Sequence, residues 1–197
     1  MMISTEDIKR LRMLTSAGVM ECKKALEEAD GDFAQAQTVL MERAVQKAEK
    51  KAEREVKHGV VDTYIHGDGR IGVLIEVHCE TDFLSKGAPF RGLVRDLALQ
   101  IASEAPLYIN AEDVPQEEIA KVAAEAEQAA IAEGKPARVI EQIKQGKVRK
   151  YISEVCLMEQ RFIKNTDIAV AELVRNFIGQ SGENVQVSFF VRRQIDG

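Results

Sequence analysis

Three adjacent residues combine side chains that acid–base and nucleophilic chemistry often use: His78, Cys79 and Glu80. A cysteine becomes a strong nucleophile when a neighbouring base takes its proton. The residues around this trio alternate between apolar and polar, which predicts a β-strand, and neighbours on a strand point to opposite faces. His78 is therefore poorly placed to activate Cys79, and we expect Cys79 to be a small core residue. An enzyme remains one alternative for this chain.

The chain has three histidines and three cysteines, and neither set has a spacing typical of metal ligands. The cysteines, Cys22, Cys79 and Cys156, are odd in number and far apart, so they do not indicate a disulfide framework. Isolated thiols of this kind are typical of a reduced, cytoplasmic protein. We therefore expect no metal, no cofactor and a cytoplasmic location.

A second set of residues is suited to binding instead of catalysis. The polar connector at residues 81–87 holds the carboxylate of Asp82 beside the large ring of Phe83. A phenylalanine in a connector most often folds back onto the core of its own chain. The alternative is a loop that presents Asp82 and Phe83 to a partner, because loops on a rigid scaffold frequently carry function. Taken alone, the residue types leave both interpretations open.

Two strongly patterned elements flank this connector and must position it. Alternation over residues 71–79 predicts a half-buried strand. Pro89 suits the first turn of a following helix, where its missing N–H costs nothing. Apolar residues then recur on one face of that helix, at Phe90, Leu93, Val94, Leu97 and Ile101.

The N-terminal residues 4–46 predict three short helices. Ser4 can cap the first helix, with Asp7 three residues later. Residues 15–18 and Gly31 would separate the helices, because glycine tolerates the conformations of tight turns. The inner face of the first helix is expected to hold Ile8, Leu11 and Leu14. Such a bundle is more often a binding module than a catalytic one.

The rest of the chain predicts an α+β core over residues 58–197, after a charged linker or helical extension at residues 47–57. A strand at residues 60–65, a glycine-rich turn and the strand at 71–79 would form a hairpin. A third strand follows Gly182. The expected fold class is therefore α+β: a three-helix bundle over residues 1–46, and then a three-stranded antiparallel sheet with helices.

Two helical regions lie between the second and third strands. Residues 113–155 predict a helical hairpin, whose second helix Gly146 is expected to interrupt. Thr166 is expected to cap a last helix that ends at Gly179.

Composition limits the classes of partner. Of 197 residues, 30% are charged and 45% are apolar, and the net charge is −5. An acidic chain is a poor general nucleic-acid binder, because that affinity depends on neutralising phosphates. The N-terminus lacks an apolar segment of signal-peptide length, and no stretch is long enough to cross a membrane. We therefore expect a soluble protein that binds neither nucleic acid directly nor a membrane.

Two segments of the chain resemble one family. Residues 11–26, LRMLTSAGVMECKKAL, with GDFAQA after them, resemble the N-terminal, ubiquitin-associated-like domain of translation elongation factor Ts. Residues 75–90, IEVHCETDFLSKGAPF, are similar to the core signature of that family, in which Thr81, Asp82 and Phe83 are unchanged. Further similar segments follow in the family's order through nearly the whole chain.

The resemblance implies a guanine-nucleotide exchange factor for elongation factor Tu, the GTPase that delivers aminoacyl-tRNA. It implies that one segment pushes between helices of the GTPase and disturbs its magnesium site: Thr81, Asp82, Phe83 and Leu84. It also implies that a second set docks on the nucleotide domain: Leu11, Val19, Met20 and Lys23. Such a factor acts by binding and makes or breaks no covalent bond.

The chain departs from the family's usual residues at several positions. Glycine, asparagine, valine and proline are usual where this chain has Ser16, His78, Leu84 and Arg161.

The sheet also predicts self-association. Three strands offer one face to their own helices and leave the other face uncovered, and Leu74 and Phe190 fall on this second face. Exposed apolar area of that kind usually marks an interface, and twofold pairing is the commonest way to cover it. We expect a homodimer that binds two GTPases, although the helical hairpin could instead cover the face. A scaffold whose three-helix module binds a ubiquitin-like or helical partner is the other alternative.

Overall fold

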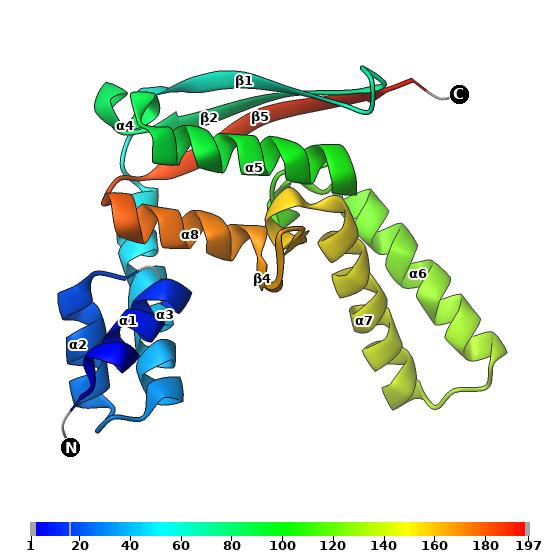
Figure 1. Cartoon of the computed structure of the whole chain (residues 1–197). Coiled ribbons are helices and arrows are strands. Elements are labelled where there is room, and N and C mark those ends of the chain that lie inside the picture. The colour runs from blue at the N-terminus through cyan, green and yellow to red at the C-terminus, as the bar shows by residue number, and fades with distance from the viewer. Residues whose placement is uncertain (1–2, 16, 196–197) are drawn as a thin grey trace. The chain divides into compact units, whose positions relative to one another are not determined.

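The computed structural model describes residues 3–15 and 17–195 (Figure 1). Ser16, one of the departures named above, lies outside this range. The described elements, in chain order, are α1 (Thr5–Thr15), α2 (Val19–Glu28), α3 (Phe33–Ala52), β1 (His58–His66), β2 (Ile71–Cys79), α4 (Asp82–Lys86), α5 (Ala88–Glu104), η1 (Ala111–Asp113), α6 (Gln116–Ala132), α7 (Ala137–Val155), η2 (Leu157–Glu159), β3 (Arg161–Phe162), β4 (Asn165–Ala169), α8 (Val170–Ser181) and β5 (Val185–Gln194).

The strands form two sheets. The larger one has the strand order β1-β2-β5 and is antiparallel, and β3 pairs with β4 in a small antiparallel hairpin. The described chain combines helices with a three-stranded antiparallel sheet, so the predicted α+β class is confirmed.

The chain divides into two compact units. The first contains residues 1–61, 76–93 and 172–187, and the second contains residues 62–75, 94–171 and 188–197. The charged run at 47–57 begins as a helical extension, because α3 continues to Ala52 before the backbone leaves the helix.

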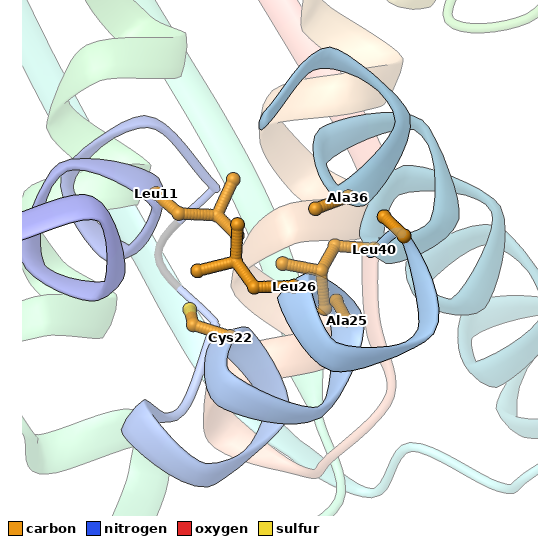
Figure 2. Close-up of a cluster of buried hydrophobic side chains, with 7 residues drawn as sticks. Leu11, Cys22, Ala25, Leu26, Ala36 and Leu40 are labelled. Atoms are coloured by element: carbon orange, nitrogen blue, oxygen red, sulfur yellow. The ribbon is translucent and has the colours of Figure 1, made fainter. Parts of the chain in front are cut away.

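The N-terminal bundle in the first unit is held by a core of small and medium apolar side chains (Figure 2). Asp7 N–H donates to Ser4 Oγ over 3.0 Å, and Asp32 caps α3 by accepting the N–H of Gln35, also over 3.0 Å. Each bond satisfies an amide that a helix start leaves without an intrahelical partner. The fully or nearly fully buried residues are Leu11, Cys22, Ala25, Leu26, Ala29, Ala36 and Leu40.

One predicted inner residue of α1 lies outside this core. Leu14 is 57% exposed and its neighbour Met13 is 84% exposed, whereas Leu11 is completely buried. The expected inner face therefore holds for Leu11 and is wrong for Leu14.

The predicted strand and helix around residues 71–104 are both present, and their apolar faces are buried as the periods indicated. In β2 the buried side chains are Val73, Ile75, Val77 and Cys79. In α5 they include Phe90, Leu93, Val94, Leu97 and Ile101. Within the first unit, Gly59 permits β1 to approach β2 closely, because a Cβ there would lie 2.3 Å from the carbonyl oxygen of Val77.

In the second unit, α6 and α7 form the predicted helical hairpin (Figure 1). Glu118 of α6 accepts hydrogen bonds from Tyr108 Oη over 2.9 Å and from Tyr151 Oη of α7 over 2.6 Å. The bond to Glu118 favours the neutral phenol, and it raises the pKa of Tyr151 to about 12.

The structure contradicts two predictions about the helical regions. Gly146 does not interrupt α7, which is continuous from Ala137 to Val155. A single glycine inside a helix costs only about 1 kcal/mol relative to alanine, which the packing of α6 against α7 outweighs. Thr166 does not cap a helix but lies within β4, and α8 runs past Gly179 to Ser181, before Gly182 with a φ of +79°. A β-branched residue such as threonine suits the extended strand that pairs with β3.

Candidate functional site

The segment that was expected to be a loop begins a short helix. We call Thr81, Asp82, Phe83 and Leu84 the tip segment. Thr81 is the N-cap of α4, and its Oγ1 accepts the N–H of Leu84 over 3.2 Å. The prediction of an irregular polar loop is therefore wrong. A threonine cap with an acidic residue in the first turn is a favourable helix start, and this signal was present in the sequence.

Phe83 points into solvent from this helix and is 86% exposed. The interpretation in which its ring folds back onto the core does not apply to this structure. Leu84 is half-buried, and Ser85, whose Oγ donates to the carbonyl of Asp82 over 2.9 Å, is buried. The helix is thus anchored through its inner side while the aromatic ring remains accessible.

Asp82 is exposed beside Phe83 and has one partner within its own helix. Lys86 Nζ donates to Asp82 Oδ2 over 2.7 Å. This hydrogen bond lowers the pKa of Asp82, so the carboxylate is ionised at neutral pH and can accept further hydrogen bonds.

The base of the tip segment is joined to a distant part of the chain. Glu183, in the turn between α8 and β5, accepts the N–H of Thr81 over 2.9 Å and its hydroxyl over 2.7 Å. Glu80, in turn, accepts the N–H of Asn184 over 2.6 Å. Neither glutamate could be assigned to the site from the sequence, because no local period connects residues that are more than 100 positions apart.

The four residues expected to dock on a partner have different environments. Met20 is 64% exposed and Val19 is 49% exposed, so both offer apolar surface. Lys23 is also exposed and forms an ion pair with Glu27 at 3.7 Å. Leu11 is 0% exposed and belongs to the core of the bundle. The expectation of a direct contact at Leu11 must therefore be corrected: this side chain supports the bundle and does not reach its surface.

His78 and Cys79, the residues considered above for nucleophilic chemistry, make structural contacts in the fold. Cys79 is buried, its thiol donates to the carbonyl of Thr81 over 3.2 Å, and burial raises its pKa. His78 Nε2 lies 2.5 Å from Glu76 Oε1, two residues along the same strand. This arrangement keeps the Cys79 thiol protonated and gives His78 a different partner, as the strand geometry predicted.

Neither a metal site nor a membrane-spanning helix is present in the described part of the chain. No group of three or more histidine, cysteine, aspartate or glutamate residues within it could hold a metal ion. Likewise, none of its helices is long and apolar enough to cross a membrane.

The structure is thus that of an α+β protein with an exposed aromatic side chain, Phe83, on a short capped helix. The family model described as "Elongation factor TS" matches residues 5–195. The chain belongs to the elongation factor Ts family.

Curated relatives agree with this assignment over nearly the full chain. The elongation factor Ts of Carboxydothermus hydrogenoformans is 48% identical over 194 residues, which are 98% of this chain and 89% of the relative. That of Heliobacterium modesticaldum is 44% identical over 194 residues, which are 98% of this chain and 90% of the relative. That of Acetivibrio thermocellus is 47% identical over 191 residues, which are 97% of this chain and 89% of the relative.

Proposed function

We propose that this protein is the guanine-nucleotide exchange factor of elongation factor Tu and accelerates GDP release from that GTPase during translation elongation. The observation that carries the proposal is Phe83, a large aromatic that is 86% exposed on an anchored helix within the family's signature segment. Aromatic area is costly to leave in water unless a partner covers it during function.

In this proposal Phe83 is an apolar wedge and Asp82 is a hydrogen-bond acceptor. Mg²⁺ requires near-ideal octahedral geometry, and it bridges the nucleotide phosphates and protein ligands of a GTPase. A small shift of a helix that supports those ligands therefore weakens both metal and nucleotide binding. By reciprocity, a factor that binds the nucleotide-free GTPase most tightly loosens the nucleotide by the same factor.

A second contact is proposed at the N-terminal bundle, residues 1–46, acting as a docking module. Val19, Met20 and Lys23 give an apolar patch with a cation beside it, and their exposure is consistent with a surface contact. Leu11 would act indirectly, by supporting the packing of α1 on α2. Docking through the bundle would supply affinity, while the tip segment would supply the change at the metal.

We further propose that two copies associate through the outer face of the larger sheet, and that the dimer acts in the cytoplasm without contacting nucleic acid directly. In the second unit, α5 covers the other face: Arg192 Nε donates to the carbonyl of Ala102 over 3.1 Å, and Arg95 lies over the ring of Tyr64. The side chains on the uncovered face include Ile65, Leu74, Phe189 and Val191.

The test is release of a fluorescent GDP analogue from elongation factor Tu, with and without the factor, in Mg²⁺ and in excess chelator. We expect strong acceleration in Mg²⁺ and a much smaller ratio in chelator, because the step that the factor promotes is then already complete. Equal acceleration in both conditions would contradict the magnesium mechanism. No acceleration in either would reject the exchange function and favour a scaffold that binds another partner.

A further inference from the structure

Two glutamates connect the base of the tip segment to the turn between α8 and β5. The carboxylate of Glu183 holds the backbone of Thr81, and the carboxylate of Glu80 holds the backbone of Asn184. All four residues belong to the first compact unit. Charge-assisted hydrogen bonds to two carboxylates therefore join the start of α4 to the turn between α8 and β5.

Glu183 also orients the hydroxyl of Thr81. That hydroxyl donates its proton to Glu183 Oε1 over 2.7 Å, so its oxygen is free to accept the N–H of Leu84 over 3.2 Å. A hydroxyl has one proton and two acceptor sites, so the bond to Glu183 fixes the direction of the cap. The N-cap of α4 thus depends on a residue 102 positions away.

Helix α4 needs such external support because it has only five residues. Isolated helices shorter than about 12 residues are marginal in water, because nucleation fixes several residues for each hydrogen bond gained. Its C-terminal side is supported by Arg91, whose Nε donates to the carbonyl of Ser85 over 3.0 Å. Its N-terminal side is supported by Glu183.

The same network reaches the end of α3. Arg54, which follows the C-cap of α3, lies 3.4 Å from Glu80, and its carbonyl accepts Asn184 Nδ2 over 3.0 Å. Lys51 of α3 also donates to the carbonyl of Ile178, near the end of α8. The last helix of the bundle and the base of the tip segment are therefore connected within one unit.

We propose that Glu183 is a positioning residue for nucleotide exchange: its carboxylate fixes Thr81 and the N-terminus of α4, so that Phe83 is held in the orientation that acts on the GTPase. This inference rests on the exchange function proposed above. Glu183 need not touch the GTPase, since both carboxylate oxygens are already used within the factor.

The first arm of the test uses the free factor, without any GTPase. Amide hydrogen exchange at Thr81 and Leu84 is measured by NMR for the wild type, Glu183→Gln and Glu183→Ala. The glutamine keeps one acceptor oxygen and the alanine keeps none. We expect exchange at both amides to increase about threefold in Glu183→Gln and about tenfold or more in Glu183→Ala. The amides of Cys22 and Ala36 in the bundle should not change.

The second arm measures GDP release over a range of factor concentrations. The maximal release rate should fall in the order wild type, Glu183→Gln, Glu183→Ala, by about tenfold for the alanine. The concentration that gives half-maximal release should stay within about twofold, because the docking surface of α2 is untouched. Glu55→Gln is the matched control, since this exposed carboxylate pairs only with Lys57 among the described residues and should leave both parameters unchanged.

The outcomes separate the two proposals. If the wild type does not accelerate GDP release, the exchange function fails, whatever the first arm shows. If the wild type is active and Glu183→Ala has the same maximal rate, or if its Thr81 and Leu84 amides stay protected, the positioning role is overturned. A loss that appears only in the half-maximal concentration would also overturn it, because it would indicate a direct contact of Glu183 with the GTPase.

Discussion

At the scale of single residues, exposure separates side chains that the sequence places together. Phe83 and Cys79 both belong to the family's signature segment, yet Phe83 is 86% exposed and Cys79 is 0% exposed. The buried thiol donates to the carbonyl of Thr81, whereas most of the Phe83 ring is exposed to solvent. We therefore expect substitutions at these two positions to have opposite profiles, one affecting stability and the other affecting exchange.

The first prediction concerns Phe83→Ala. Removing an exposed side chain should change the free energy of unfolding by less than about 0.5 kcal/mol, because little buried area is lost. The maximal rate of GDP release should nevertheless fall by about tenfold or more, since the apolar wedge is absent. Thermal unfolding and GDP release on the same preparation check both parts.

Met13→Ala is a suitable control for this experiment. Met13 is similarly exposed, at 84%, but lies on α1, away from the tip segment in the sequence. It should retain a normal maximal rate. If Phe83→Ala instead melts several degrees lower and exchanges normally per folded molecule, Phe83 is a structural residue and the wedge proposal is wrong.

At the scale of elements, α7 shows how packing overrides a local signal. Gly146 lies inside the helix, and a Cβ built on it would meet no atom within 4 Å. The glycine therefore has no steric reason to be there, and its backbone freedom in the unfolded chain only opposes folding.

The second prediction follows from this geometry. Gly146→Ala should stabilise the protein by about 0.5–1 kcal/mol, because alanine loses less conformational entropy on entering a helix. Gly134→Ala is the matched control: it also has open space, but its φ of +70° disfavours any L side chain, so it should destabilise. Chemical denaturation of both variants measures the sign, and a destabilising Gly146→Ala would contradict the argument.

In the last strand, β5, burial also departs from the local sequence pattern. Phe189 and Val191 continue the alternation of Val185 and Val187 along β5. Val185 and Val187 are buried, yet Phe189 is 48% exposed and Val191 is 40% exposed. Farther along the strand it is Arg192 that bonds to the carbonyl of Ala102 in α5. The alternation of buried and exposed side chains shifts by one residue after Val187. Of the neighbours Phe189 and Phe190, Phe189 is therefore exposed and Phe190 is half-buried.

At the scale of the whole molecule, this change of phase increases the apolar area on the outer face of the sheet. Ile65 is 63% exposed and lies on the same face as Gly72, since a Cβ there would be 3.5 Å from Ile65 Cδ1. Leu74 follows two residues after Gly72 and therefore shares that face. An apolar surface of this kind is costly in water, and a twofold partner would cover it.

The third prediction is that the protein sediments as a dimer of its 21.9 kDa chain at micromolar concentration. Ile65→Glu and Phe189→Glu should each shift the population to monomer, because a charge buried without a partner opposes association. Met13→Glu, on α1, is the control and should leave the sedimented mass of the protein unchanged. Val61→Glu is unsuitable as a control, because Val61 lies on β1 together with Ile65. A single species at the monomer mass for the wild type would reject the dimer.

The sequence alone determined the features that depend on local periods and local hydrogen bonds. The strand at residues 71–79, the helix face from Phe90 to Ile101 and the cap at Ser4 are each encoded within a short segment, so they could be predicted from the sequence. The signature around Phe83 likewise identified the family before the fold was known.

The tertiary structure decided the features that depend on distant partners. It left Leu14 and Phe83 exposed, made Thr166 part of a strand and carried α7 through Gly146. It also brought Glu183 to Thr81 across 102 positions. No local pattern specifies such a pair, because the free energy of a charge-assisted hydrogen bond depends on where the fold places both groups and on how much water it removes from them.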